Sequence, residues 1–569
     1  MTKKYINRAE VKEYLAKVDP EVLDYITQCE LQIDKLADIG YQLSYERHLP
    51  TLLNLIIVEA MRITNADGGT LYLRTEDDRL AFEIMKNKTM GTDMGGVAET
   101  PIPDAIYPVK LYLEDGKPNH NAVSAYVGLT GETLNIPDAY ENEEFDFSGA
   151  KGFDQRFGYR SKSFLTIAMK NHENDIIGVL QLLNAVDPST EEIIPFSKDM
   201  QKLIESLASQ AAVAITNVRL IEGLENLLES FIQLIADAID EKSPYTGGHC
   251  SRVPAIAMML AEKVNETKEG IFADVQFTKE DMDELRIAAW LHDVGKITTP
   301  EYVVDKATKL ETIYDRVHEL NVRFEVLKRD AEIAYLKGLA ETDDPKEQQQ
   351  LRDDYDATLI QLEDDRLFLN QCNTGGEFMA DELKDRVKAI AKEKIVLNGE
   401  EQDLLSEEWV MNLNISRGTL TNSERDKIND HIVVTIDMLE KLPFPKHLKR
   451  VPEFAGGHHE TMIGTGYPKG LTKDDMSIQA RIMGIADIFE ALTASDRPYK
   501  KGKTLSEAMR IMGFFKIDHH IDADLFDVFL REKVYQEYAD EYLDPKYIDE
   551  VDEQKYIEMQ PKDLEAAKN

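Results

Sequence analysis

The sequence predicts a multidomain protein: an α+β domain at the N-terminus, then a long coiled-coil helix, then an all-α domain that carries a helical insertion. Length supports this prediction, because 569 residues exceed what one hydrophobic core normally holds. The segments whose apolar residues alternate as in strands all lie before residue 195. After them, apolar residues recur at alternate spacings of four and three, and helical periodicity continues beyond that stretch.

Composition narrows the classes of protein. The formal net charge of −40 argues against polymeric nucleic acid or an anionic membrane as a partner, because a phosphate backbone needs a basic face. A small phosphate ligand is not excluded, since a few local cations suffice to bind it. We find no apolar run of membrane-spanning length and no signal-peptide pattern, so we expect a cytoplasmic protein. Three scattered cysteines predict reduced thiols.

The first domain follows a helical N-terminal segment, residues 1–43. A helix pattern over residues 49–64 leads into a turn at 65–69 and a strand at 70–74. The other predicted strands are residues 80–85, 124–127, 163–169 and 176–183, with a hairpin turn at 171–175 between the last two. One helix followed by these strands predicts an α+β sheet domain.

This domain resembles a GAF domain over residues 44–195. The resemblance is carried by residues 68–72, 130–133, 135–138 and 177–184. It implies a GAF-like sensor for an unknown small molecule, or a dimerisation module without a ligand. Residues 151–155, Lys-Gly-Phe-Asp-Gln, depart from the Asn-Lys-Phe-Asp-Glu signature of members that bind cyclic nucleotides, so we infer no ligand of that class.

The next stretch, residues 196–240, predicts a coiled-coil signalling helix. Its seam runs for about five heptads without a skip and without proline. The seam residues are Leu203, Leu207, Gln210, Ala214, Asn217, Ile221, Leu224, Leu228, Phe231, Ile235 and Ala238. We therefore expect a homodimer, with Asn217 fixing the register. The alternative is a helix packed on its own domain, which imitates the pattern for two or three turns.

The third domain contains the residues that carry chemistry. His292 and Asp293 are adjacent and are followed by Lys296, so the pair can bind divalent metal ions while the lysine reaches an anion held by them. The histidines and aspartates of this domain are enough for two shared ions: His249, His292, His431, His458, His459, Asp293 and Asp487. A third ion needs additional oxygen ligands, and Glu241 is the first candidate.

Two further segments lack a chemical motif. Residues 307–416 are highly charged, with apolar residues at helical spacing, and predict an inserted helical hairpin with a solvated outer face. Residues 541–569 form an acidic tail.

Residues 241–306 and 417–540 resemble an HD-GYP domain, from the Tyr-Thr-Gly-Gly-His run at 245–249 to Arg-Pro-Tyr-Lys at 497–500. The resemblance implies metal-dependent hydrolysis of cyclic di-GMP. It makes the seven His and Asp residues metal ligands and adds Glu241 as the eighth. It also places Gly466, Tyr467 and Pro468 at the substrate, with Arg497 and Lys500 on phosphate oxygens.

Catalysis would rest on His292, Asp293 and Lys296, with two or three divalent ions. Ligand softness suits Fe, Mn and Zn almost equally, so the resemblance alone favours iron, then manganese. The expected product is pGpG, with further cleavage to GMP as an extension. Ile463 stands where the family usually has a polar residue, which leaves two alternatives: another cyclic dinucleotide such as cyclic GMP-AMP, or a non-catalytic receptor.

Overall fold

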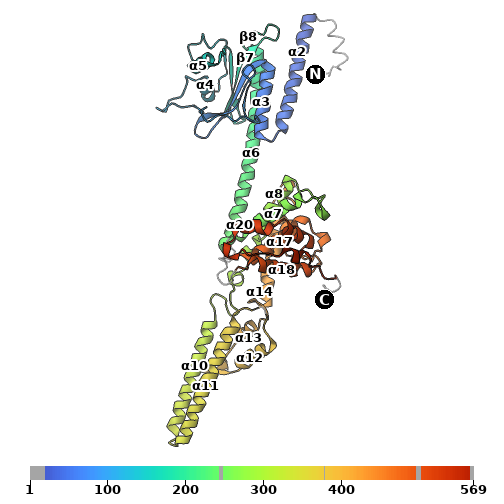
Figure 1. Ribbon diagram of the computed structural model, residues 1–569. Helices are drawn as coiled ribbons and strands as arrows, with labels where there is room; N and C mark the ends of the chain where they lie inside the picture. The colour runs from blue at the N-terminus through green and yellow to red at the C-terminus, as the bar shows by residue number, and fades with distance from the viewer. Residues whose placement is uncertain (1–18, 243–247, 377, 495–501, 564–569) are drawn as a thin grey trace, which may run out of the picture. The chain divides into compact units, whose positions relative to one another are not determined.

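The computed structural model describes residues 19–242, 248–376, 378–494 and 502–563 (Figure 1). The chain divides into two compact units, Met1–Leu227 and Leu228–Asn569. Among the described residues, we find no helix that is both long enough and apolar enough to cross a membrane.

The first unit is an antiparallel sheet covered by helices on both faces. Its elements are α2 (Pro20–Tyr45), α3 (Leu49–Thr64), β1 (Ala66–Arg74), β2 (Arg79–Asn87), β3 (Thr92–Gly95), β4 (Val109–Lys110), α4 (Val123–Thr130), β5 (Leu134–Ile136), α5 (Ser148–Phe157), β6 (Phe164–Lys170), β7 (Ile176–Val186) and β8 (Ile193–Ile194). The strand order is β3-β2-β1-β7-β6-β5, with β4 paired to β2 and β8 to β7. Because side chains alternate along a strand, Leu71 packs with α3 on one face and Tyr72 with α4 on the other.

Most of the predicted strands are confirmed. Residues 70–74, 80–85, 163–169 and 176–183 lie within β1, β2, β6 and β7, or extend them by one residue at the start of β6, and the hairpin joins β6 to β7. Residues 124–127 were wrongly predicted as a strand, because they belong to α4, which ends at the left-handed Gly131. A short apolar run buried on every side has no period that separates helix from strand. The turn at 65–69 is also wrong, since β1 begins at Ala66.

Helix α6 (Lys198–Lys242) covers the predicted coiled-coil segment. Its early apolar residues, such as Leu207 and Ala211, pack into the core of the first unit, so part of the seam serves its own domain. Near its end, Ile232, Ala236 and Ile239 pack into the core of the second unit. Some seam residues lie between or next to these two packed stretches and remain exposed: Ile221, Leu224, Leu228, Phe231 and Ile235. The coiled coil itself stays a prediction.

The second unit is a helical domain with one main core. Its helices are α7 (His249–Glu266), α8 (Lys279–Leu291), α9 (Glu301–Val304), α14 (Asn422–Asn429), α15 (His431–Glu440), α16 (Val451–Gly456), α17 (Ile478–Thr493), α18 (Leu505–Ile517), α19 (Ala523–Arg531), α20 (Val534–Tyr542) and α21 (Glu553–Ile557). Short 3-10 helices connect them: η1 (Gly270–Phe272), η2 (Val294–Thr298), η3 (Lys446–Leu448), η4 (Lys473–Asp475) and η5 (Pro545–Tyr547).

The insertion has a hydrophobic core of its own. It consists of α10 (Val317–Glu341), α11 (Pro345–Asn373), α12 (Asp381–Ala391), β9 (Lys394–Leu397), β10 (Glu400–Asp403) and α13 (Glu407–Leu413). Helices α10 and α11 lie side by side as a hairpin (Figure 1), and Asp344 caps the second helix with Pro345 in its first turn. At the base, the buried Lys306 donates to Glu424 at 2.8 Å, which ties the start of the insertion to the helix that follows it.

The acidic segment after residue 541 is not a free tail in its described part. Val551 and Tyr556 are buried in the main core. The Lys516 ammonium donates to the Tyr556 and Ile557 carbonyl oxygens at 3.1 and 3.0 Å, and also contacts Asp527 at 2.7 Å. The many charged residues suggest a solvated tail, but the packing of this segment depends on the few apolar residues between them.

Lys516→Met is expected to lower the free energy of unfolding of this domain by about 3 kcal/mol, because it leaves Asp527 and two carbonyl groups without their buried cation. Thermal and urea denaturation measure the change. Lys263→Met removes only a surface pair with Glu266 and is the control. Equal stability of the two variants would contradict the role assigned to Lys516.

Candidate metal centre

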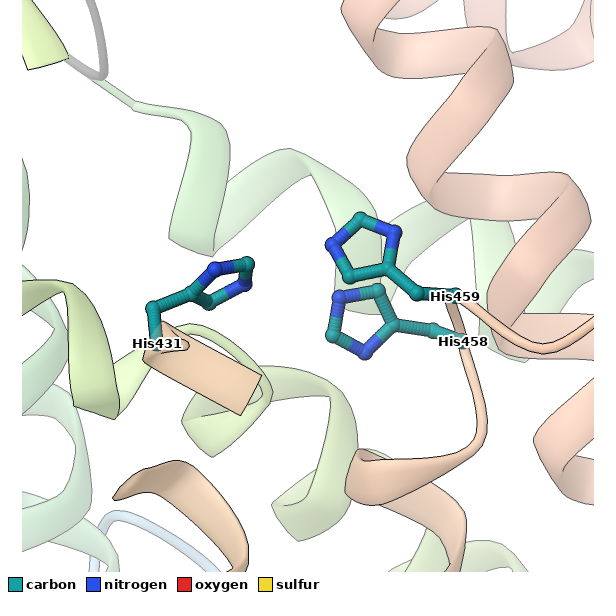
Figure 2. Close-up of side chains that lie close together, drawn as sticks. All are labelled: His431, His458 and His459. Carbon is teal, nitrogen blue, oxygen red and sulfur yellow. The ribbon is translucent and has the colours of Figure 1, made fainter. Parts of the chain in front are cut away.

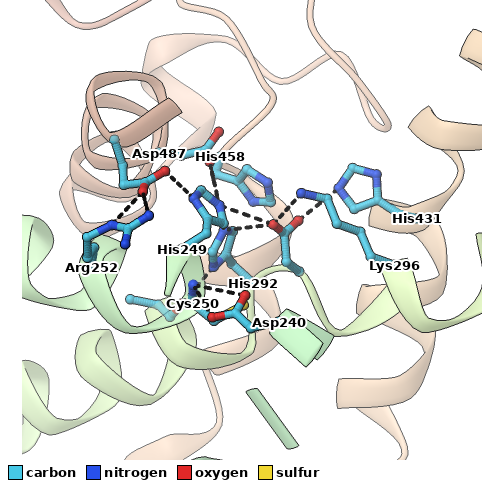
Figure 3. Close-up of polar contacts among 12 residues, drawn as sticks. Asp240, His249, Cys250, Arg252, His292, Lys296, His431, His458 and Asp487 are labelled. Atoms are coloured by element: carbon cyan, nitrogen blue, oxygen red, sulfur yellow. Dashed lines mark hydrogen bonds and ion pairs between the residues drawn. The ribbon is translucent and has the colours of Figure 1, made fainter. Parts of the chain in front are cut away.

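Five segments of the second unit bring seven predicted ligands together. His249 is the first residue of α7, His292 and Asp293 follow the end of α8, and His431 is the first residue of α15. His458 and His459 follow α16, and Asp487 lies in α17. The imidazoles and carboxylates converge around Asp293, although the insertion separates His292 from His431 in the sequence. Figure 3 shows His249, His292, His431 and His458 gathered in one region, with Lys296 beside them.

A glycine permits this convergence. The Gly295 amide donates to the Thr435 hydroxyl at 2.9 Å, so η2 lies directly against α15. A Cβ atom at residue 295 would lie 1.9 Å from the His431 carbonyl oxygen. Only glycine therefore lets His431 approach Asp293, and this explains why glycine follows the His-Asp pair.

Backbone carbonyls orient three of the imidazoles. His292 Nδ1 lies 2.7 Å from the Ala289 carbonyl oxygen, and His458 Nδ1 lies 2.6 Å from that of Ala455. His431 Nδ1 makes the same contact with the Ile428 carbonyl oxygen. Each Nδ1–H donates to the backbone carbonyl three residues earlier. Nε2 is then the unprotonated nitrogen and faces the centre, as metal ligation requires.

Several buried atoms at the centre have no hydrogen-bond partner. They are His431 Nε2, His458 Nε2 and Asp293 Oδ1. Figure 2 shows the rings of His458 and His459 facing that of His431. Three sets of ligand atoms lie within 4.8 Å of one another: His431, His458 and His459; His249, His292 and Asp487; and His292, Asp293 and His458. Nitrogen and carboxylate donors that are buried and unpaired fit divalent transition-metal ions.

The charge state of the ligands also suits a metal. Burial and the neighbouring imidazoles lower the pKa of His458 well below its usual value, and burial lowers the pKa of His459 to about 4. Burial alone would raise the pKa of Asp293, but Lys296 and His292 outweigh it and lower that pKa well below the usual value. At neutral pH the site therefore offers the neutral imidazoles of His458 and His459 and the ionised carboxylate of Asp293.

His249 differs from the other imidazoles. Burial opposes its charge, but Glu490, Asp293 and Asp487 outweigh burial and raise its pKa well above the usual value. Its Nε2 lies 3.3 Å from both Asp293 Oδ2 and Asp487 Oδ1. These carboxylates require a nearby cation, and a divalent ion bound by the same oxygens would displace the proton of His249.

Glu490 is a site residue that the sequence reasoning missed. Its buried carboxylate contacts His249 Nδ1 on one oxygen and Arg252 at 2.7 Å on the other. The glutamate orients the histidine, and the arginine offsets the glutamate's charge. Its signal was present in the sequence, since Glu490 follows Asp487 by one helical turn and shares its face of α17.

Lys296 lies where the sequence predicted. Its ammonium is 2.5 Å from Asp293 Oδ2 and its side chain is partly exposed. Burial lowers the pKa of this lysine, but Asp293 and Asp487 outweigh burial and raise it, so Lys296 stays charged. A charged, partly accessible ammonium beside the ligands can contact an anion held there.

The Gly-Tyr-Pro loop adjoins the centre through Tyr467, whose ring stacks on His459 with a centroid distance of 4.8 Å. Glu460 holds the loop by accepting the Lys469 and Leu471 amides at 2.8 and 2.9 Å. Gly466 lies so close to Glu460 that a Cβ would come within 2.5 Å of its Cα. Ile463 is only 8% exposed, so this apolar residue is accommodated by burial within the protein.

Three predicted residues are not placed at the centre. Glu241 is exposed in the last turn of α6 and belongs to none of the three ligand sets, so the described structure does not support it as a ligand. Arg497 and Lys500 lie outside the described residues. Pro468 follows Tyr467 through a cis peptide bond.

Two kinds of family model match the chain. Residues 48–215 match the model of the GAF domain, and residues 246–356 and 408–525 match two models described as the HD domain. The chain therefore contains a GAF domain followed by an HD domain, which confirms the predicted fold class.

Similar proteins are cyclic-dinucleotide phosphodiesterases by name. The 3'3'-cGAMP-specific phosphodiesterase 3 of Vibrio cholerae is 41% identical over 96 residues, 17% of this chain and 20% of that protein. A cyclic di-GMP phosphodiesterase of Pseudomonas aeruginosa is 43% identical over 74 residues, 13% of this chain and 17% of that protein. The matches thus span a fifth or less of these relatives. A solved GAF domain/HD domain protein from Geobacter sulfurreducens matches 31% of this chain and 98% of that chain, at 13% identity and a TM-score of 0.22.

Glu490→Gln is expected to weaken metal binding roughly ten- to a hundredfold, because the neutral amide no longer orients His249 as the carboxylate does. Titration with Mn²⁺ against a competing chelator measures the affinity. Glu266→Gln, at the exposed end of α7, the helix that begins with His249, is the matched control. Equal Mn²⁺ affinity in the two variants would argue against an orienting role for Glu490.

Proposed function

We propose that this protein is a metal-dependent phosphodiesterase that hydrolyses cyclic di-GMP to pGpG, and onward to GMP, under control of its GAF domain. The observation that carries the proposal is the convergence of seven His and Asp side chains from five segments, with three buried donor atoms left unpaired. A buried polar atom without a hydrogen-bond partner carries a desolvation cost. A cluster with a purely structural role would therefore be expected to pair these atoms. The expected cytoplasmic location belongs to the same proposal.

The seven residues would hold two or three divalent ions, iron by preference and manganese next. Bound there, such ions supply Lewis-acid stabilisation of a phosphodiester and activation of water. Lys296 would place a positive charge beside the phosphate, where negative charge develops in the transition state. No serine or cysteine nucleophile is needed for this reaction.

Tyr467 would orient the substrate. Burial and the nearby carboxylates of Asp487 and Asp293 raise the pKa of its hydroxyl, so the ring stays neutral. It stacks on His459 and can present its other face or its hydroxyl to a guanine or ribose. The backbone contacts of Glu460 fix the loop and therefore the position of this ring.

The names of the relatives support a cyclic dinucleotide as the substrate and favour a second candidate, 3'3'-cGAMP, alongside cyclic di-GMP. The two ligands share the phosphodiester ring and differ in one base. A non-catalytic receptor was a further alternative from the sequence, motivated by Ile463. Ile463 is buried and belongs to none of the three ligand sets, which supports catalysis over that alternative.

Protein prepared without air should contain roughly two or three equivalents of iron or manganese, and the variant with both His292→Ala and Asp293→Ala should lose hydrolysis entirely. Elemental analysis measures the metal, and chromatography measures the pGpG and GMP formed from cyclic di-GMP. Turnover of cyclic GMP-AMP under the same conditions ranks the two substrates. His447→Ala, an exposed histidine in η3, is the control.

Two results would contradict the proposal. Hydrolysis by protein freed of metal would show that the seven residues do not act through ions. Tight binding of the nucleotide without product over long incubation would show a receptor.

The proposal includes a homodimer joined along α6. The exposed seam from Ile221 to Ile235 is apolar over two heptads, and the g positions beside it are also apolar and exposed at Leu220, Leu227 and Leu234. Solvent-exposed leucines at heptad spacing are stabilised by a second copy of the same helix. A parallel dimer would connect two GAF domains to two HD domains through one pair of helices.

Leu224→Lys is expected to dissociate the dimer, because a charge at the seam would be buried between the two helices. Sedimentation equilibrium measures the mass. Glu222→Lys, two residues away and outside the seam, adds a lysine without entering the interface and should leave the mass of a dimer. A dimer in both variants, or a monomer in the unaltered protein, would rule out this interface.

A further inference from the structure

The last turn of α6 reaches the segment that carries Lys296. The Lys242 ammonium donates to the carbonyl oxygens of Lys296 at 3.0 Å, Ile297 at 2.5 Å and Thr299 at 2.7 Å. These carbonyls belong to η2 and the residue that ends it. The end of a short helix leaves carbonyls unsatisfied, and a cation is favoured there by their aligned dipoles. Lys242 is thus a cap that α6 supplies to η2.

This cap bears on the metal centre through one residue. Lys296 lies within η2, and its own ammonium contacts Asp293 at 2.5 Å. Within η2, the Lys296 amide donates to the Asp293 carbonyl at 2.9 Å and the Thr299 amide to the Lys296 carbonyl at 3.1 Å. A five-residue 3-10 helix of this kind has few bonds of its own, so three contacts from Lys242 are a large part of what fixes it.

The same turn of α6 also contacts the opposite side of the centre. The Asp240 carboxylate accepts the Cys250 amide at 3.2 Å, next to His249 at the start of α7. Ile239 and Ala236 are fully or almost fully buried in the main core, so this end of the helix is held firmly within the domain. The end of α6 therefore contacts both segments that carry residues of the centre.

We infer that Lys242 is a positioning residue for Lys296, and that the last turn of α6 is the point at which the active centre responds to that helix. This inference rests on the proposed function and deepens it. A shift of α6 by a fraction of a turn would move the ammonium of Lys242 away from the three carbonyls. Lys296 would then lose its fixed position beside Asp293, although Lys242 itself contacts none of the seven metal ligands.

A purely structural role is the competing explanation, and the chain offers a matched control for it. Lys516 is a lysine of the same domain that also donates to main-chain carbonyls, two of them, and it has no described contact with the centre. Lys516→Met therefore reproduces the loss of an ammonium that caps carbonyls, at a more buried position, without affecting η2. Lys242→Arg keeps a cation with several donors and serves as the conservative variant.

The first test follows backbone amides in the metal-loaded, full-length protein by hydrogen–deuterium exchange. In Lys242→Met, the amides of residues 295–299 are expected to exchange about tenfold faster, or more, than in the unaltered protein. In Lys516→Met they are expected to change no more than the rest of the domain. Unchanged exchange in Lys242→Met, or an equal increase in both variants, would overturn the inference. Neither outcome depends on the identity of the substrate.

The second test is kinetic. Lys242→Met is expected to lower kcat roughly ten- to a hundredfold with metal content unchanged, because misplacing a catalytic group by about 1 Å has effects of this size. Lys242→Arg should recover most of the activity. In a Lys296→Met background, adding Lys242→Met should have no further effect, because the first residue acts through the second.

An equal loss of kcat from Lys242→Met in both backgrounds would refute positioning through Lys296. If the unaltered protein hydrolyses no cyclic dinucleotide, the proposed function fails by itself, and the exchange experiment still decides whether Lys242 positions η2. The two failures are therefore distinguishable.

Discussion

Burial of the Asp293 carboxylate among imidazoles is the constraint on which the rest of the HD domain depends. Removing a carboxylate and several imidazoles from water is costly unless their charges and lone pairs are matched. Here Lys296 matches one oxygen of Asp293, and the other is left beside His431 without hydrogen-bond geometry. The imbalance can be removed by a bound cation. The ligands come from five segments around one core. This arrangement is therefore better explained as a scaffold for metal ions than as a purely structural core.

The surroundings orient the ligands with backbone groups and one acid. Carbonyls three residues earlier set the tautomers of His292, His431 and His458, and Glu490 does so for His249. Backbone acceptors are stiff, because helices fix them, so these imidazoles need no further side chain to hold them. The insertion leaves this arrangement intact, since it has its own core and is tied at its base by Lys306 and Glu424. An extra domain can thus interrupt the sequence between two ligands without disturbing the centre.

Helix α6 links this chemistry to the rest of the chain. Its first turns pack on the GAF domain, its last turns pack in the HD core, and its seam between them is exposed. At its end, Lys242 and Asp240 contact the segments that carry Lys296 and His249. Only a few hydrogen bonds are involved, so a small displacement of the helix would alter them. A helix with this arrangement suits control of an active centre better than a passive linker would.

Much of this site could be predicted from the sequence because its chemistry is local. The His-Asp pair, the His-His pair and the Gly-Tyr-Pro loop are each recognisable within a few residues. The two pairs contain four of the seven predicted ligands, and all seven converge in the structure. The strands at 70–74, 80–85 and 176–183 were predicted by alternation, which depends on one face being buried. Residues 124–127 were wrongly predicted as a strand and belong to α4, because a short, largely buried run shows no period that separates helix from strand.

Contacts between segments that are distant in the chain could be found only in the tertiary structure. Glu490 on His249 and Lys242 on η2 each join residues far apart in the chain. The position of Glu490 one turn after Asp487 hints at a role in the site, but the partner of neither charged residue can be read from the sequence. In the folded chain, Glu241 belongs to none of the three ligand sets. The described part of the acidic segment packs on the domain and is held there by Lys516. The sequence by itself determined which atoms can bind a metal, because that property belongs to the residue. Which charged residues support those atoms depends on burial and distance, and these exist only in the folded chain.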